Sequence, residues 1–126
     1  MGKTFDREIG IKTVYSKNGK SKLKMKVVEK LLNHGGIAHG GVIASFCDCV
    51  LAEAIHNKLP KNKWCVTVEI SIDFMEPANR NEILIGEGKL VRMGKTLAFV
   101  EGKIKTEKSK KFIAKATGIW FIKNKS

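Results

Sequence analysis

The segment between residues 42 and 57 constrains the fold of this chain more than any other. Its apolar residues recur at spacings of three and four, which is the period of an α-helix that packs against a core. The apolar positions are Val42, Ile43, Phe46, Cys47, Val50, Leu51, Ala54 and Ile55. They cover most of the helix circumference, so this helix needs other structure wrapped around it. Pro60 ends the segment, because proline cannot continue a helix.

Much of the remaining chain alternates between apolar and polar residues, which predicts β-strands. Asn18-Gly19 favours a tight hairpin turn between a strand around residues 9–15 and a lysine-bordered strand over residues 22–27. Further strands are predicted over residues 83–92, 96–105 and 112–122. The clearest strand covers residues 64–75, and strict alternation divides its side chains between two faces. One face is predicted to carry Trp64, Val66, Val68, Ile70, Ile72 and Phe74, and the other Cys65, Thr67, Glu69, Ser71, Asp73 and Met75.

The order of these elements, β-β-α-β-β-β-β, predicts an α+β fold. One antiparallel sheet wraps around a long central helix, in a single domain over residues 1–126, as the length allows. Ala114, Ala116 and Gly118 share one face of the last strand, and we predict that these small residues let the helix approach closely. The arrangement leaves one face or edge of the sheet for a partner subunit.

The charge of the chain is strongly positive and unevenly placed. There are 24 Lys or Arg residues against 12 Asp or Glu residues, a formal net charge of +12. Residues 1–30 carry +6 and residues 91–126 carry +8, whereas the residues between are close to neutral. Such an excess keeps nucleic-acid binding open as an alternative. The aromatic residues at positions 64, 74, 99, 112 and 120 argue against it, because they fall in strand patterns typical of a core, not of a base-stacking platform.

Candidate chemistry concentrates between Asn33 and Asp48. Gly40 and Gly41 stand where the helix begins, and a helix N-terminus presents unpaired N–H groups and a partial positive charge. This suits an oxyanion site for an acyl carbonyl, although glycines there also suit a tight loop-to-helix turn. Asp48 lies among apolar helix residues, where a carboxylate is costly unless it is solvated, paired or used in chemistry. It is a candidate general base or nucleophile, with a partly exposed helix edge as the alternative.

The spacing of these two candidates has a consequence for assembly. Gly40 and Asp48 are eight residues apart, or roughly 12 Å along a helix. One carbonyl cannot contact both residues in the same chain. A site that uses both therefore predicts a dimer.

Other candidate sites are weaker. His34, His39 and the three cysteines lack the spacing of a zinc site, so we expect no metal. Gly-Lys-Thr at 94–96 resembles the end of a phosphate-binding loop, but Lys89 stands where its first glycine is needed, which favours a hairpin turn. An odd number of cysteines with no paired framework suits the cytoplasm. No apolar run reaches the ~18 residues that span a bilayer, so we expect no membrane association.

A set of motifs between Asn33 and Ile122 carries a family resemblance. The set comprises Asn33, His39-Gly40-Gly41, Asp48, and the segments 66–78 (VTVEISIDFMEPA), 91–96 (VRMGKT) and 114–118 (AKATG). These residues resemble the hotdog-fold acyl-CoA thioesterases of the PaaI-like group. The resemblance implies a hotdog fold, assembly into homodimers or homotetramers, and active sites at the subunit interface.

The resemblance also implies a role for individual residues. Asp48 would be the catalytic carboxylate, acting as general base on water or as nucleophile. Gly40 would polarise the thioester carbonyl through its backbone N–H from the opposite subunit. Asn33 and His39 would orient the carbonyl or the water. Thr67 matches a position where the family often has a hydroxyl that holds water, although a β-branched residue is also ordinary in a strand.

On this interpretation coenzyme A is part of the substrate, and no separate cofactor is needed. Its phosphates would attract basic residues, and the candidates for contact are Arg92, Gly94, Lys95, Thr96 and Arg80. Two alternatives stay open, a non-catalytic hotdog module that binds acyl-CoA and a nucleic-acid-binding protein. The sequence does not indicate which acyl group is bound.

Overall fold

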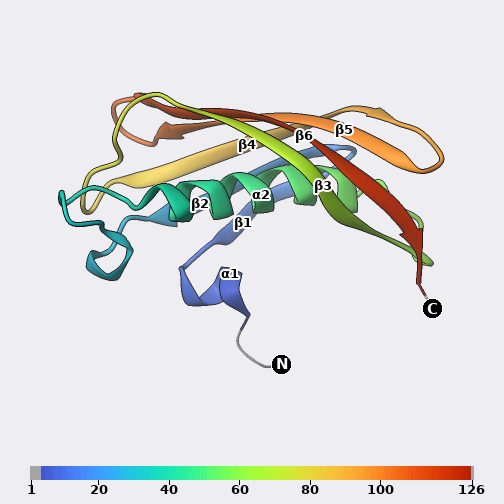
Figure 1. The fold of residues 1–126 in the computed structure, drawn as a ribbon, viewed down its shortest axis with the longest axis horizontal. Helices are drawn as coiled ribbons and strands as arrows, with labels where there is room; N and C mark the ends of the chain where they lie inside the picture. The colour runs from blue at the N-terminus through green and yellow to red at the C-terminus, as the bar shows by residue number, and fades with distance from the viewer. Residues whose placement is uncertain (1–3, 126) are drawn as a thin grey trace.

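The computed structural model describes residues 4–125 and contains one six-stranded antiparallel sheet curved around a long helix (Figure 1). The helix is α2 (Gly40–His56). The strands are β1 (Lys12–Lys17), β2 (Lys20–Lys26), β3 (Lys63–Phe74), β4 (Ile83–Met93), β5 (Leu97–Thr106) and β6 (Phe112–Asn124), in the sheet order β1-β2-β4-β5-β6-β3. The predicted sheet around a central helix is thus confirmed. Two short elements were not predicted, α1 (Phe5–Glu8) and the 3₁₀ helix η1 (Glu29–Leu31).

Helix α2 lies along the inner face of the sheet and packs against β2, β3, β4 and β5 (Figure 1). Its buried side chains are Ile43, Phe46, Cys47, Val50, Leu51, Ala54 and Ile55. The apolar period begins at Val42, whereas the helix itself begins at Gly40, where the sequence places the helix N-terminus. His39 caps this end, because the Gly41 N–H donates to its Nδ1 over 2.9 Å, which satisfies one of the unpaired first-turn amides.

Close approach of α2 to the sheet depends on glycines in the middle strands. A Cβ on Gly86 or Gly88 of β4 would overlap Val50, and a Cβ on Gly102 of β5 would lie 2.8 Å from Leu51. The prediction that the small residues of the last strand serve this purpose was wrong for Gly118. A Cβ there would collide with the indole of Trp120, so this glycine makes room for a neighbouring ring within β6.

A β-bulge interrupts β3 and overturns the predicted strict alternation of its side chains. The pairing of β3 with β6 shifts register between Thr67 and Glu69, so the extra residue, Val68, swaps the two faces. Before the bulge, Thr67 points towards α2. After it, Ile70 and Ile72 pack against the core. Strand β3 is also an edge of the sheet.

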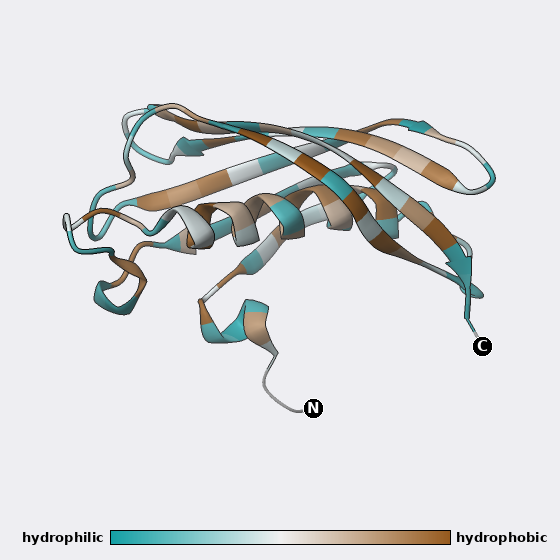
Figure 2. Cartoon of the chain, viewed as in Figure 1, coloured by the Kyte–Doolittle hydropathy of each residue, from teal (hydrophilic) through white to brown (hydrophobic). Residues whose placement is uncertain are grey.

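The outer face of the sheet, opposite α2, is charged across its middle and apolar at one end. Paired positions on successive strands form a row of mixed charge, Lys22, Glu87, Lys103, Lys115 and Asp73, beside a groove of about 730 Å³. Exposed apolar side chains gather towards the β4–β5 turn, namely Val91, Leu97, Phe99 and Phe121. Hydrophilic and hydrophobic residues alternate along these strands (Figure 2).

The aromatic residues are less buried than their strand pattern predicts. Trp120 is 1% exposed, but Trp64, Phe74 and Phe99 are 42%, 58% and 37% exposed. Their assignment to the core was therefore wrong. They lie on the outer sheet face or at the end of the edge strand, positions that alternation alone does not distinguish from the core.

Within residues 4–125, no helix combines the length and the apolar character needed to cross a membrane.

Candidate active site

The carboxylate of Asp48 is held by a residue from another element. Thr67 Oγ1 on β3 donates a hydrogen bond to Asp48 Oδ1 over 3.0 Å. Asp48 is half-buried in the middle of α2, and Thr67 is exposed beside it. Because the bulge at Val68 follows directly, Thr67 faces the helix while the next residues of β3 change sides. The structure thus brings together two of the predicted site residues. Among residues 4–125, the second carboxylate oxygen of Asp48 has no hydrogen-bond partner, so it can accept from a water or a substrate.

The start of α2 presents a free amide. The Gly41 N–H is bound to the imidazole of His39, and the Val42 and Ile43 N–H groups donate to the His39 carbonyl over 2.9 and 3.2 Å. In the described part of the chain, the Gly40 N–H has no hydrogen-bond acceptor. Gly40 is also exposed. An exposed unpaired amide at a helix N-terminus can donate to an anionic or polarised oxygen.

Asn33 and His39 shape the loop before the helix. Asn33 Oδ1 accepts hydrogen bonds from the Gly35 and Ile37 N–H groups over 2.8 and 3.3 Å, and the Asn33 N–H donates to the Ile37 carbonyl over 2.8 Å. His39 accepts through Nδ1, so its neutral ring carries the proton on Nε2. The predicted orienting groups that remain available are therefore the side-chain NH₂ of Asn33 and the Nε2–H of His39.

The two halves of the predicted site remain apart within one chain. Asp48 lies beside Thr67, in the first half of β3, whereas the Cβ position of Gly40 lies 4.0 Å from the ring of Phe74, the last residue of β3. Thr67 and Phe74 are roughly 23 Å apart along an extended strand. Two separate positions along one edge strand, Thr67 and Phe74, therefore lie beside different halves of the candidate site.

Three free cysteines surround the carboxylate without pairing. Burial raises the pKa of the Cys65 thiol to about 11, and the nearby Asp48 carboxylate adds to the shift. Burial likewise raises the pKa of Cys47 to about 12, again with a contribution from Asp48. The pKa of Cys49 is raised further, by burial and then by the charge of Asp6. These thiols are neutral at physiological pH, which makes them poor nucleophiles.

The raised pKa predicts how Cys65 reacts with alkylating agents. An unperturbed thiol is mostly ionised above about pH 9, whereas the Cys65 thiol stays protonated until about pH 11. In the native protein, alkylation of Cys65 by iodoacetamide should therefore keep accelerating between these two values. In the unfolded chain it should level off. Peptide mass spectrometry measures both rates, and identical pH profiles would contradict the environment described for this thiol.

The predicted contacts to CoA phosphates lie at two ends of the molecule. Arg80 precedes β4 and pairs with Glu29 over 3.6 Å. Arg92, Gly94, Lys95 and Thr96 lie at the end of β4 and in the turn that follows. Because β4 extends for 11 residues, roughly 33 Å separates the two groups. One CoA molecule bound to one chain cannot reach both.

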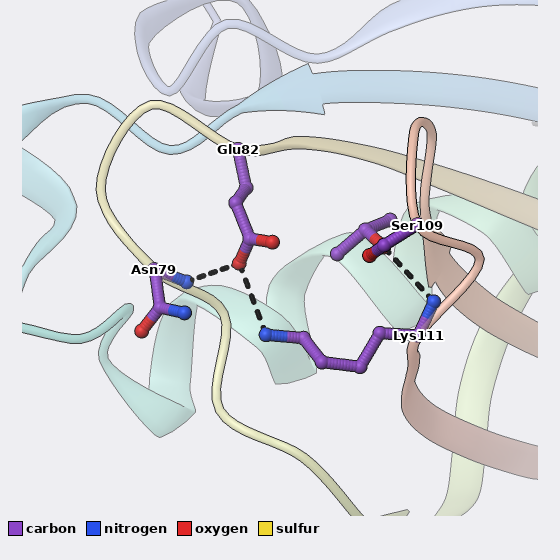
Figure 3. A network of polar contacts seen from close by, with 5 residues as sticks. Asn79, Glu82, Ser109 and Lys111 are labelled. Carbon is purple, nitrogen blue, oxygen red and sulfur yellow. Dashed lines mark hydrogen bonds and ion pairs between the residues drawn. The ribbon is translucent and has the colours of Figure 1, made fainter.

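Sequence reasoning missed a polar cluster at the same end of the fold as Gly40. Glu82 accepts hydrogen bonds from the Asn79 N–H over 2.7 Å and from Nζ of Lys111 over 3.2 Å (Figure 3). Glu82 and Lys111 are far apart in the sequence, and neither lies in a recognisable motif. No signal in the sequence indicates their contact.

The residues that the structure describes include no group of three or more His, Cys, Asp or Glu side chains placed to hold a metal ion.

Comparison with known proteins gives this geometry a context. Residues 35–113 match the Thioesterase superfamily. Acyl-coenzyme A thioesterase 13 of Homo sapiens is 31% identical over 113 residues, which cover 89% of this chain and 80% of the human protein.

Solved structures agree with the fold. The PaaI protein of E. coli, from the phenylacetic acid degradation operon, gives a TM-score of 0.88 at 21% identity and covers 96% of this chain and 85% of its own. The smu.793 protein of Streptococcus mutans, solved with acetyl CoA bound, gives 0.86 at 27% identity and covers 98% and 94%. By sequence and by structure, this chain is a hotdog-fold member of the Thioesterase superfamily.

Proposed function

We propose that this protein hydrolyses acyl-CoA thioesters to a free acid and CoA. The observation that carries the proposal is the Asp48 carboxylate, which lies among mostly apolar residues in the middle of α2 and accepts a hydrogen bond from the Thr67 hydroxyl. Membership of the Thioesterase superfamily and the likeness to a human acyl-CoA thioesterase support the same chemistry. A structural neighbour solved with acetyl CoA supports the choice of thioester.

In the proposed reaction, the Gly40 N–H of one subunit donates to the thioester carbonyl oxygen and stabilises the negative charge that develops there. Asp48 of the other subunit takes a proton from water as the water oxygen bonds to the carbonyl carbon. Collapse of the tetrahedral intermediate breaks the C–S bond, and the CoA thiolate leaves and takes up the proton that Asp48 removed from water. If Asp48 acts as nucleophile instead, its carboxylate oxygen attacks the carbonyl carbon, the C–S bond breaks, and the CoA thiolate leaves as an acyl-aspartyl anhydride forms. Water then hydrolyses the anhydride to the free acid and restores the Asp48 carboxylate.

The proposed site needs two subunits, and the edge strand β3 suits this arrangement. Unpaired strand edges readily pair with another chain, and β3 carries the exposed side chains of Val68 and Phe74. If two β3 strands pair antiparallel with Thr67 opposite Phe74, Asp48 of one chain lies near Gly40 of its partner. We therefore propose a homodimer as the active unit, with a homotetramer as a further assembly of two such dimers.

The same pairing reconciles the two groups of CoA candidates. Antiparallel strands place the end of the fold that carries Arg80 beside the partner's opposite end. Arg80 of one subunit and Arg92, Lys95 and their neighbours Gly94 and Thr96 of the other then lie on the same side of the assembly. Their positive charge suits the CoA phosphates. The proposed reaction needs no cofactor, because coenzyme A is part of the substrate. The free thiols support a cytoplasmic location.

A screen tests the proposal directly. Purified protein is incubated with short, medium, long and aromatic acyl-CoAs, and free thiol is measured with a chromogenic disulfide. Release from at least one class is expected, and the preferred class identifies the acyl group. Binding of acyl-CoA without release, by calorimetry, would instead favour the non-catalytic alternative.

Thr67→Val is expected to lower kcat about tenfold. Valine keeps the shape and the strand propensity but removes a hydrogen bond to a charged group, so Asp48 loses the contact that orients its carboxylate. Thr67→Ser retains the hydroxyl and should stay within about twofold of the original rate. Equal kcat values for the two variants in the thiol-release assay would show that the hydroxyl has no catalytic role.

A further inference from the structure

The Glu82–Lys111 pair joins two turns that are distant in the sequence. Glu82 directly precedes β4, and Lys111 directly precedes β6. Both side chains are 26% exposed, so water screens their attraction only in part. The carboxylate also accepts the Asn79 N–H. Figure 3 shows it between the two donors, with the cation reaching across from the β5–β6 turn.

Internal hydrogen bonds stabilise the turn that supplies Lys111. Thr106, which is 2% exposed, accepts the Lys111 N–H at its hydroxyl over 2.9 Å and pairs with the hydroxyl of Ser109 over 2.6 Å. Its backbone N–H donates to the Lys111 carbonyl over 2.9 Å. Lys111 thus leaves a fixed backbone position, which reduces the side-chain entropy lost when it binds Glu82.

The turn held by Glu82 pairs through its backbone with the loop that precedes Gly40. The Ala38 N–H donates to the Ala78 carbonyl over 2.8 Å, and Ile37 forms a β-bridge with Asn79. Ala38 and Ala78 are 6% and 2% exposed. Asn79 is the residue whose N–H the Glu82 carboxylate binds, and Ala38 is two residues before Gly40. The contact between the buried residues Ala38 and Ala78 and the bridge between Ile37 and Asn79 thus connect the ion pair to the segment that carries the free amide.

We infer that Glu82 and Lys111 are positioning residues for the Gly40 amide. The inference rests on the proposed function for its catalytic consequence, but not for its structural one. The ion pair fixes the turn over residues 77–82, the turn fixes the backbone of Ala38, and Ala38 sets the direction of the Gly40 N–H. Neither charged side chain touches the substrate. Their effect falls on the transition state, because an oxyanion donor acts only when it is aimed at the developing charge.

Substitutions of the pair test this chain of contacts. Glu82→Gln and Lys111→Met are each expected to lower kcat about tenfold or more with KM nearly unchanged, since small displacements of catalytic groups are costly. Lys111→Arg keeps the charge and the donor and should restore most of the rate. The double variant should be no slower than either single variant, because each substitution abolishes the same ion pair. Glu107→Gln, which removes a neighbouring charge that contacts neither Asn79 nor Lys111, is the matched control.

Hydrogen exchange provides a readout that does not depend on turnover. In Glu82→Gln the Ala38 amide, which donates to the Ala78 carbonyl, should exchange at least about tenfold faster, while the amides in the middle of α2 keep their protection. Unchanged exchange at Ala38 would overturn the inference, whatever the activity. If the Ala38 amide exchanges faster in Glu82→Gln but the original protein releases no thiol from any acyl-CoA, the structural part of the inference is supported and the proposed function is contradicted. A variant that unfolds as a whole loses protection in α2 as well. In that case Lys111→Arg, which retains the ion pair, provides the test. Faster exchange of the Ala38 amide in Lys111→Arg would contradict the inference.

Discussion

Replacing Asp48 with alanine should lower thiol release by about 10²–10⁴-fold, the usual contribution of a positioned general base. Asp48 lies in the middle of α2, and its carboxylate accepts the hydrogen bond from Thr67. Without this carboxylate, water at the thioester carbon has no proton acceptor, and a covalent route has no nucleophile. The remaining rate should come from polarisation of the carbonyl alone. Steady-state kinetics with the best acyl-CoA measures the loss.

Two controls make this result specific. Asp48→Asn keeps the size of the side chain and its hydrogen bond to Thr67, so it separates the charge from the shape and should be nearly as slow. Glu101→Ala removes a carboxylate from an exposed position of β5 and should leave the rate unchanged. Light scattering checks that each variant keeps the assembly of the original protein. Full activity of Asp48→Ala in an intact assembly would falsify the proposed mechanism.

The second large effect is expected from Gly40→Pro, which removes a single hydrogen-bond donor. Gly40 is the first residue of α2, a position where proline is well tolerated because no intrahelical acceptor exists there. The residue before it, His39, has φ −60° and ψ 139°, an extended conformation that suits a following proline. The fold should therefore survive. Loss of one oxyanion donor should lower kcat by about 10²–10³-fold.

Gly40→Ala is the matched control for this substitution. It adds a Cβ, as proline does, but retains the N–H. Space is available, because the nearest neighbour of that Cβ is the Phe74 ring at 4.0 Å. Alanine should keep most of the activity. If alanine and proline are equally slow, crowding by the new side chain explains the loss, and the Gly40 amide is not the donor.

Mixing the two impaired subunits shows whether each site draws on both chains. When Asp48→Ala and Gly40→Pro chains are refolded together, half of the dimers formed at random contain one chain of each kind. Such a heterodimer has one site with both groups intact and one site with neither. About a quarter of the original rate should return. Rates that stay at the level of the separate variants would place Asp48 and Gly40 in unrelated sites.

The sequence predicted best what depends on a single element. The helical period around Phe46 and Val50 locates α2, and the clustering of glycines before it marks a loop and helix N-terminus. Asp48 stood out because a carboxylate is unusual on such a surface. Each of these signals lies within a short stretch of chain, where periodicity and residue type carry the information.

Features that depend on contacts between elements were not predictable in the same way. The bulge at Val68 follows from how β3 pairs with β6, and it reverses the faces of every later residue of the strand. Burial of an aromatic residue depends on which sheet face the helix covers, so Trp64 and Trp120 look alike in the sequence. The contact between Glu82 and Lys111 joins two turns brought together by the sheet, which a single sequence does not reveal.

Because β3 is an edge strand, the proposed activity depends on the concentration of the protein. Each chain holds Asp48 beside Thr67 in the first half of this strand and Gly40 beside Phe74 at its end, so in the proposed arrangement a newly made monomer has no complete site. Hydrolysis of CoA esters would then start only after two chains meet, and the specific activity would fall as the protein is diluted below its dissociation constant. A cell that contains little of this protein would leave its CoA esters intact, whereas a modest rise in abundance would switch on their turnover more than proportionally.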